Sequence, residues 1–139
     1  MNDKQLRKAN FKLIELELYC YHENKRELEL LRESIVEDTV YQEVSVQSGS
    51  TSDITANKAI KLVSSKEILE LERRIRGIEE ALNIIKLDEE KYRLLKMKYF
   101  ERKYTDRWIW RELNISDRTF YRWRREIIEV AGSRLGWRV

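Results

Sequence analysis

The sequence predicts an all-α fold, in which an N-terminal helical bundle or coiled-coil region precedes a C-terminal three-helix unit of the helix-turn-helix type. Composition is the first indication: the 139 residues include no proline and only four glycines, with 38 % charged and 42 % hydrophobic residues. This mixture is typical of amphipathic helices that keep one face in water. The second indication is an apolar spacing of three and four residues over most of the chain. The third is a pair of capped helical patterns near the C-terminus, separated by a short turn.

The first helical region is expected over residues 3–37. Its apolar residues fall into two stripes: Leu6, Leu13, Leu16 and Cys20, followed by Leu28, Leu31 and Ile35. The spacing breaks near residues 21–24, where Asn24 and Glu27 could form a capping pair. We therefore expect two helices here, or one helix with a kink.

Residues 38–59 have a different composition, rich in valine, serine and threonine. Four residues in this stretch suit a short extended segment: Val40, Tyr41, Val44 and Val46. The Ser/Thr/Gly run at residues 48–52 suits a flexible turn or linker. A stretch of this length without a helical pattern is either mobile or held in place for a purpose. Gly49 is not followed by the Gly-Lys-Ser/Thr of a phosphate-binding loop, so no nucleotide site is expected here.

The clearest helical periodicity begins after Ser64 and Glu67, which form a capping box. Six apolar residues then alternate in steps of three and four: Ile68, Leu71, Ile75, Ile78, Leu82 and Ile85. This heptad seam covers nearly three repeats, the lower limit for predicting a coiled coil. Two alternatives therefore stay open: an internal core shared with the first helices, or a homodimer through residues 64–87.

Residues 88–139 contain the predicted three-helix unit. Asp88 can cap a support helix, and Thr105 can cap the helix after it, because each side chain can accept a hydrogen bond from a first-turn amide. Asn114 tolerates the left-handed conformation that ends many helices. Ser116 is the next N-cap, so the chain predicts a helix, a three-residue turn and a second helix.

Apolar residues stand where a helix-turn-helix needs its small core: Ile109, Leu113, Ile115, Phe120 and Trp123. The crossing point of the two helices usually holds a small residue, and here that position is Trp110. We expect either a wider spacing between the helices or an indole turned outward onto a neighbouring helix.

The polar face of this pair of helices is basic and predicts contact with DNA. The candidate residues are Arg118, Thr119, Tyr121, Arg122 and Arg125 on the second helix, with Arg107 and Arg111 on the first. Guanidinium groups pair with phosphates or with guanine edges in the major groove, where the second helix of such a motif inserts.

The charge distribution agrees with this assignment. Residues 91–139 contain 14 Lys and Arg against 6 Asp and Glu, whereas residues 1–90 contain 14 against 19. Such polarity suggests a nucleic-acid-binding end and an end with another role. We therefore predict a helical assembly or partner region over residues 1–87, with the linker inside it, and a DNA-binding region over residues 88–139.

Two stretches of sequence resemble a known family. Residues 115–119, Ile-Ser-Asp-Arg-Thr, continue into Arg-Arg-Glu-Ile-Ile at 124–128 and end at Leu135-Gly136, and upstream an apolar stripe follows a tyrosine-rich corner. In these features the chain resembles the RinA-type family of bacteriophage transcriptional activators, and its C-terminal part is similar to promoter-binding region 4 of sigma factors. The resemblance implies activation of phage late genes in the cytoplasm of a bacterial host, with double-stranded DNA and host RNA polymerase as partners.

Other functions can be weighed against this one. A small terminase subunit, which takes part in phage DNA packaging, also joins a helix-turn-helix to an oligomerising helical region. An enzyme is not expected, since no nucleophile with a base and no carboxylate metal cluster stands out. Cys20 and His22 supply too few ligands for a metal site, so neither a metal nor a cofactor is expected. No apolar run approaches the roughly 20 residues of a membrane helix.

Overall fold

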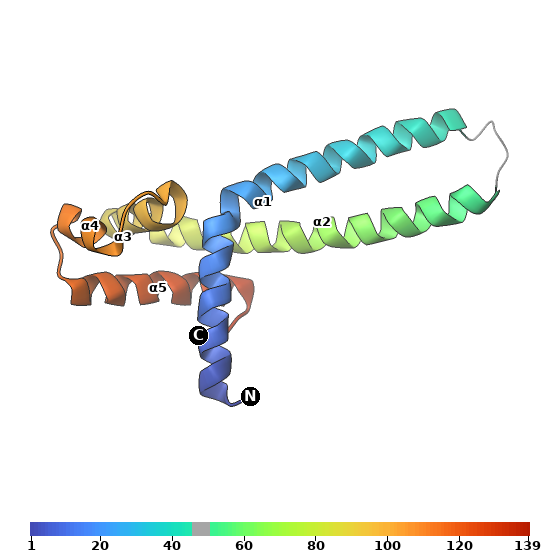
Figure 1. The fold of residues 1–139 in the computed structure, drawn as a ribbon. Coiled ribbons are helices and arrows are strands. Elements are labelled where there is room, and N and C mark those ends of the chain that lie inside the picture. The colour runs from blue at the N-terminus through green and yellow to red at the C-terminus, as the bar shows by residue number, and fades with distance from the viewer. Residues whose placement is uncertain (46–50) are drawn as a thin grey trace. The chain divides into compact units, whose positions relative to one another are not determined.

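The computed structural model describes the backbone of residues 1–45 and 51–139, and the side chains of residues 1–37 and 65–139. All described elements are helical (Figure 1): α1 (Asp3–Ser45), α2 (Thr51–Ile85), α3 (Glu89–Leu95), the π-helical turn η2 (Lys96–Glu101), α4 (Asp106–Glu112) and α5 (Asp117–Leu135). The all-α fold is therefore confirmed for this part of the chain. Two compact units are present: one combines Met1–His22 with Arg74–Val139, and the other is Glu23–Arg73.

The first helix is longer and more continuous than its sequence predicts. α1 runs through residues 21–24 as one helix, so the first of the two alternatives, a division into two helices, is wrong, whereas the single helix of the second alternative is present. Asn24 and Glu27 have the spacing of a capping pair, but a cap needs a non-helical residue at its first position, and Asn24 is helical.

Helix also replaces most of the linker expected over residues 38–59. Val40, Tyr41 and Val44 belong to α1 and are not extended, whereas Val46 and the centre of the Ser/Gly run lie outside the described residues. Valine, serine and threonine each lower helix propensity by at most about 0.7 kcal/mol relative to alanine. An existing helix gains a hydrogen bond with each added residue, so it can continue through such a stretch.

The second long helix likewise starts earlier than predicted. α2 begins at Thr51, so the capping box of Ser64 and Glu67 does not open a helix. In the second unit, α2 and α1 are joined by an ion pair between Arg32 and Glu72, with 2.6 Å between the guanidinium nitrogen and the carboxylate oxygen.

The heptad seam of α2 is buried within the single chain. Five of its six residues are at most 6 % exposed: Leu71, Ile75, Ile78, Leu82 and Ile85. The sixth, Ile68, is half-buried. Internal packing therefore accounts for the spacing of the seam. A homodimer through residues 64–87 would need other side chains, such as Leu69 and Ile84, which are exposed.

The face of α1 that is buried differs from the predicted stripe. Leu6, Leu13 and Leu16 are 48 %, 48 % and 53 % exposed, whereas Ile14 and Leu18 are fully buried. Both sets have helical spacing, so periodicity alone does not decide which set faces the core. The second predicted stripe agrees better with the structure, because its residue Leu28 is buried.

In the first unit, the N-terminal part of α1 and the end of α2 pack against α5, which Figure 1 shows in blue, yellow-green and red. Two glycines allow these approaches. A Cβ atom on Gly132 of α5 would lie 2.9 Å from Cδ1 of Ile14, and one on Gly77 of α2 would lie 2.9 Å from Cδ2 of Leu135. Both distances are too short for a real Cβ, so the absence of a side chain brings the helices together.

The division into units therefore differs from the predicted boundary between residues 87 and 88. The cap at Asp88 is real, because its side chain accepts a hydrogen bond from the Lys91 amide, but it does not separate two domains. Residues 1–22 and 74–87 share a core with the C-terminal helices. The cap at Asp88 marks the start of α3 correctly, whereas the partners of a helix's apolar face follow from tertiary packing.

Candidate nucleic-acid interface

The helix-turn-helix has the caps that its sequence predicts. The hydroxyl of Thr105 accepts a hydrogen bond from the Trp108 amide at 3.2 Å, and the hydroxyl of Ser116 accepts one from the Thr119 amide at 3.1 Å. Asn114 has a φ of 55°, the left-handed conformation expected at the turn. These bonds satisfy amides that the first turn of each helix leaves unpaired, and they fix where α4 and α5 begin.

The small core between α4 and α5 is also present. Ile109 and Phe120 are fully buried, and the other three predicted core residues are half-buried. The indole of Trp110 lies edge-on to the ring of Phe120, with centroids 5.6 Å apart, and 6.1 Å from the ring of Tyr121. Trp110 is therefore part of the contact between the two helices, at the position where a smaller residue is usual.

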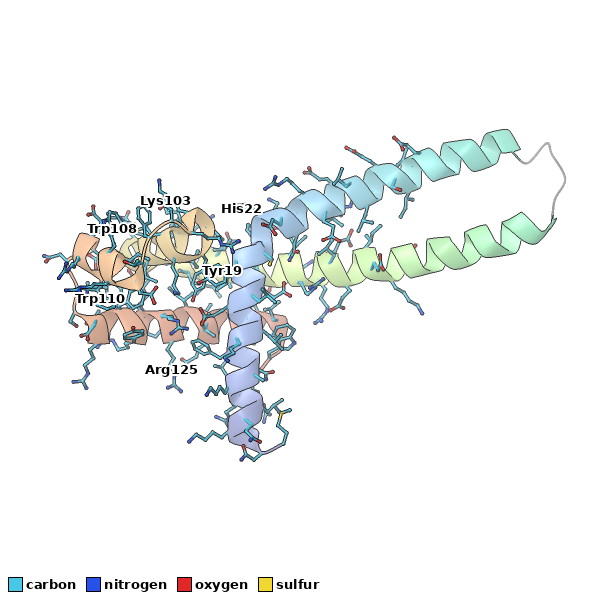
Figure 2. All side chains as sticks on the ribbon, in the orientation of Figure 1. Tyr19, His22, Lys103, Trp108, Trp110 and Arg125 are labelled. Carbon is cyan, nitrogen blue, oxygen red and sulfur yellow. The ribbon has the colours of Figure 1, made fainter. Side chains whose placement is uncertain are left out.

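Most of the predicted DNA-binding residues are exposed on α4 and α5, among them Arg125, which is labelled in Figure 2. Six of the seven are exposed: Arg107 and Arg111 on α4, and Arg118, Tyr121, Arg122 and Arg125 on α5. Thr119 differs, since it is half-buried and its hydroxyl oxygen accepts a hydrogen bond from Ser116 at 3.0 Å. Its main role in the structure is at the helix cap.

Of the three predicted arginines on α5, Arg125 has an acidic partner among the described residues and the other two do not. Nε of Arg125 donates to Glu129 of the next turn at 3.1 Å. The Arg118 and Arg122 side chains form no ion pair with another described residue. An exposed i, i+4 pair such as that of Arg125 contributes about 0.3–0.5 kcal/mol, little enough to exchange for a phosphate.

An aromatic pair beside this face is not predicted from the sequence. The rings of Tyr104 and Trp108 are stacked, with centroids 4.0 Å apart and an angle of 8° between their planes. Trp108 is 43 % exposed, and Nζ of Lys103 lies 5.2 Å from the centre of the Tyr104 ring (Figure 2). The signal in the sequence is a tryptophan in the first turn of a helix, outside the apolar spacing.

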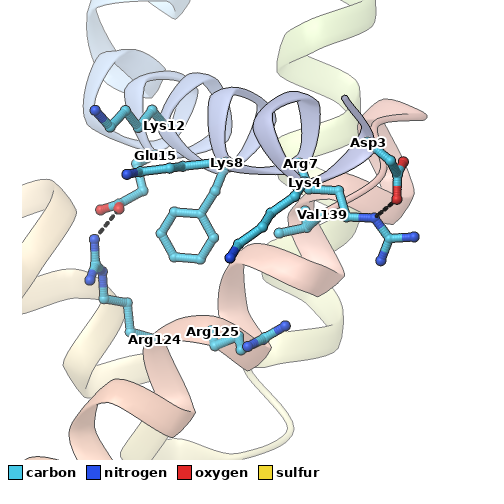
Figure 3. A pocket seen from close by; sticks show the side chains of 10 residues that line it. Asp3, Lys4, Arg7, Lys8, Lys12, Glu15, Arg124, Arg125 and Val139 are labelled. Carbon is cyan, nitrogen blue, oxygen red and sulfur yellow. Dashed lines mark hydrogen bonds and ion pairs between the residues drawn. The ribbon is translucent and has the colours of Figure 1, made fainter. Parts of the chain in front are cut away.

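A basic cleft opens between the first turns of α1 and the middle of α5 (Figure 3). Its volume is about 710 Å³, and its lining includes Lys4, Lys8 and Lys12 from α1 with Arg125 from α5. The ring of Phe11 also lines it. The sequence does not predict this cleft, because the two walls are more than a hundred residues apart in the chain.

Beside the cleft, a buried carboxylate joins three helical elements. Glu15 of α1 is 9 % exposed and accepts hydrogen bonds from Oη of Tyr99 in η2, at 3.0 Å, and from the guanidinium of Arg124 in α5. The Arg124 guanidinium also lies 5.0 Å from the centre of the Phe11 ring. The Arg124 side chain is therefore held by contacts within the protein and is 27 % exposed, whereas that of its neighbour Arg125 is 70 % exposed.

The electrostatics of this cluster favour the protonated forms of Tyr99 and Arg124. Burial, and then the nearby Glu15 carboxylate, raise the pKa of Tyr99 well above its usual value, so the phenol keeps its proton. Burial works to lower the pKa of Arg124, but the hydrogen bond and charge of Glu15 outweigh it and raise that pKa. The cluster is thus one carboxylate, one guanidinium and one neutral phenol.

The described residues show neither a candidate metal site nor a membrane-spanning helix. No group of three or more His, Cys, Asp or Glu side chains that could hold a metal lies among the described residues. No helix there is long and apolar enough to cross a membrane.

Residues 21–132 match the model of a family described as a protein of unknown function, DUF722. The match covers most of the chain. The protein belongs to the DUF722 family. No curated protein and no solved structure matches the chain. The part of this DUF722 protein that matches includes the helix-turn-helix and almost all of α5, whereas the three lysines of the cleft precede it.

Proposed function

We propose that this protein is a sequence-specific DNA-binding transcriptional regulator that inserts the first turns of α5 into the major groove. The observation that carries the proposal is the exposed row of Arg118, Arg122 and Arg125 on the second helix of a capped helix-turn-helix. Residues four and three apart share one face of a helix. The major groove, about 12 Å wide, admits an α-helix whose exposed face carries the readers.

The roles of these residues follow from their positions. Arg118 and Arg122 lie on the first turns of α5, which enter the groove most deeply in a helix-turn-helix. Tyr121 is 49 % exposed between them and offers both a ring edge and a hydroxyl. Arg125 lies one turn further along, and Arg107 and Arg111 lie on the preceding helix, where phosphates are the expected partners.

Selection of bound sites from random duplex DNA tests the proposal. We expect the full-length protein to enrich one sequence and to bind it with a strong dependence on salt. The double variant Arg118→Ala/Arg122→Ala should lose the enrichment. The matched control is Arg26→Ala/Arg73→Ala, which removes two exposed arginines from the second unit. Absence of salt-sensitive DNA binding by the unmodified protein would contradict the proposal.

The finer role that the family resemblance implies is activation of phage late genes through host RNA polymerase. Transcription in vitro from a promoter that carries the selected site should rise when the protein is added to the bacterial polymerase. A role in phage DNA packaging would instead require a ring of eight or more subunits. Light scattering distinguishes the two, because we expect a regulator to be a monomer or a dimer.

A further inference from the structure

We propose that the first turns of α1 form a second DNA-binding surface, in which Lys4, Lys8 and Lys12 bind the phosphate backbone beside the groove that α5 enters. This inference rests on the proposed function, and it adds a surface that lies outside the helix-turn-helix. The lysines and Arg125 line the same cleft, so the basic face of α5 continues directly onto α1 (Figure 3).

The three lysines have the spacing of a single helical face. They stand four residues apart in α1, and such residues are neighbours on a helix surface. At a rise of 1.5 Å per residue the row is about 12 Å long. One DNA strand offers a phosphate roughly every 3.4 Å of duplex axis, so a row of this length can reach two or three phosphates.

The charges of the cleft suit a polyanion. All three of its arginines already have acidic partners: Arg7 pairs with Asp3 at 2.9 Å, Arg124 pairs with Glu15, and Arg125 pairs with Glu129 at 3.1 Å. Lys4, Lys8 and Lys12 form no ion pair with a described residue, and all three are exposed. Lys4 points across the cleft toward α5 in Figure 3. Three such ammonium groups on one face attract a regular row of phosphates more strongly than a single anion.

The position of α1 relative to α5 is fixed from inside the unit. Ile14 packs against Gly132, and Glu15 binds Arg124, so the helix that carries the lysines is anchored to the helix that carries the readers. The lysine row lies toward Arg125 and away from the helix-turn-helix turn, because the cleft includes Arg124 and Arg125 but not the first turns of α5. The second surface should therefore meet one flank of the DNA site.

The triple variant Lys4→Ala/Lys8→Ala/Lys12→Ala tests the inference in the full-length protein. We expect it to select the same DNA sequence as the unmodified protein and to bind preferred and scrambled duplexes more weakly by the same factor. The slope of log affinity against log salt should become shallower by about 0.9 for each phosphate that the lysines no longer neutralise. Hydroxyl-radical footprinting should show weaker protection on one flank of the site.

A matched triple variant, Arg26→Ala/Lys66→Ala/Arg76→Ala, removes the same charge from exposed positions elsewhere and should leave slope and footprint unchanged. An unchanged slope and footprint for the lysine variant overturns the inference alone, provided that the Arg118→Ala/Arg122→Ala variant still loses its preference. If the unmodified protein binds no DNA, the proposed function fails first. Equal losses of affinity in both triple variants would show only a general effect of net charge and would also overturn the inference.

Discussion

The carboxylate of Glu15 in α1 accepts a hydrogen bond from the guanidinium of Arg124 in α5, although the two residues are 109 positions apart in the sequence. The pair ties the N-terminal helix to the helix that we propose reads DNA. Its consequence is that the two neighbours Arg124 and Arg125 have different roles. Arg124 stabilises the fold, and Arg125 remains exposed for a partner.

Glu15→Ala should destabilise the protein. Removal of the carboxylate leaves a partly buried guanidinium and a buried phenol without their acceptor, and loss of one partner from such a pair costs roughly 2–4 kcal/mol. We expect a loss of stability at the lower end of this range, because the Arg124 side chain is 27 % exposed and water can reach it. Urea unfolding measures the change. Glu79→Ala, at an exposed position of α2, is the control and should change stability by less than about 0.5 kcal/mol.

Stability should also fall at alkaline pH because of Tyr99. Its pKa is raised in the folded protein, so the neutral phenol contributes stability that is fully present below about pH 10, the pKa of an unfolded tyrosine. That stability is lost as pH rises above this value. Tyr99→Phe should be less stable at about pH 8, since it lacks the bond to Glu15, but should lose less stability on going to about pH 11. Parallel losses of stability in the two proteins would contradict the assignment.

Gly132→Ala should bring a methyl group against α1. The new Cβ would lie 2.9 Å from Cδ1 of Ile14 and 2.9 Å from the carbonyl oxygen of Trp137, so we expect a loss of about 1–3 kcal/mol. Ile14→Val removes the Cδ1 atom and by itself should cost about 0.5–1.5 kcal/mol. If the added methyl group contacts Cδ1 of Ile14 as the structure indicates, the double variant Gly132→Ala/Ile14→Val should lose less stability than the sum of the two single losses. Additive losses would place the strain at Trp137.

The face of α2 that a homodimer could use can be determined with two variants. Leu82→Asp places a charge at a buried position and should unfold the protein, at a cost of about 3 kcal/mol or more. Leu69→Asp changes a residue that is 65 % exposed and should leave the stability of the chain nearly unchanged. Light scattering of the Leu69 variant then shows whether a dimer dissociates. A dimer that dissociates only with Leu82→Asp, in a chain that stays folded, would contradict the internal seam.

Local signals in the sequence are sufficient for the helix-turn-helix. A cap needs one side chain and an amide two or three residues away, so Thr105 and Ser116 can be placed correctly without knowledge of the fold, and Asn114 marks the left-handed turn between the two helices. The seam of α2 can be recognised by its period, but its partner cannot, because a heptad spacing serves an internal core and a dimer equally well.

Contacts between residues that are distant in the sequence cannot be predicted from such local signals. The sequence suggests Leu13 for the buried face of α1, whereas Ile14 is the core residue, since both belong to stripes with helical spacing. Glu15 and Tyr99 meet across 84 positions, and the cleft joins the two ends of the chain. The close approach of α1 to Gly132 cannot be predicted from the sequence around Gly132, because that sequence does not show which helix packs there.

Arg122 and Arg125 of α5 should have different roles in DNA binding. Arg122→Ala should cost roughly 1–3 kcal/mol of binding free energy on the selected site and should relax the preference at one base pair, because the guanidinium no longer reaches a base edge. Arg125→Ala should weaken preferred and scrambled duplexes by a similar factor and reduce the salt slope by about one unit, because one phosphate is no longer neutralised.

Binding measured at several salt concentrations on both duplexes separates these two effects. Arg124→Lys is a useful comparison, since it keeps the charge beside Glu15 and should affect stability more than DNA preference. If Arg122→Ala lowers the affinities for the two duplexes by the same factor, this part of α5 only neutralises phosphate and the base-reading residues lie elsewhere. The next side chain to replace would then be Trp108 of α4, which is exposed and stacks on Tyr104.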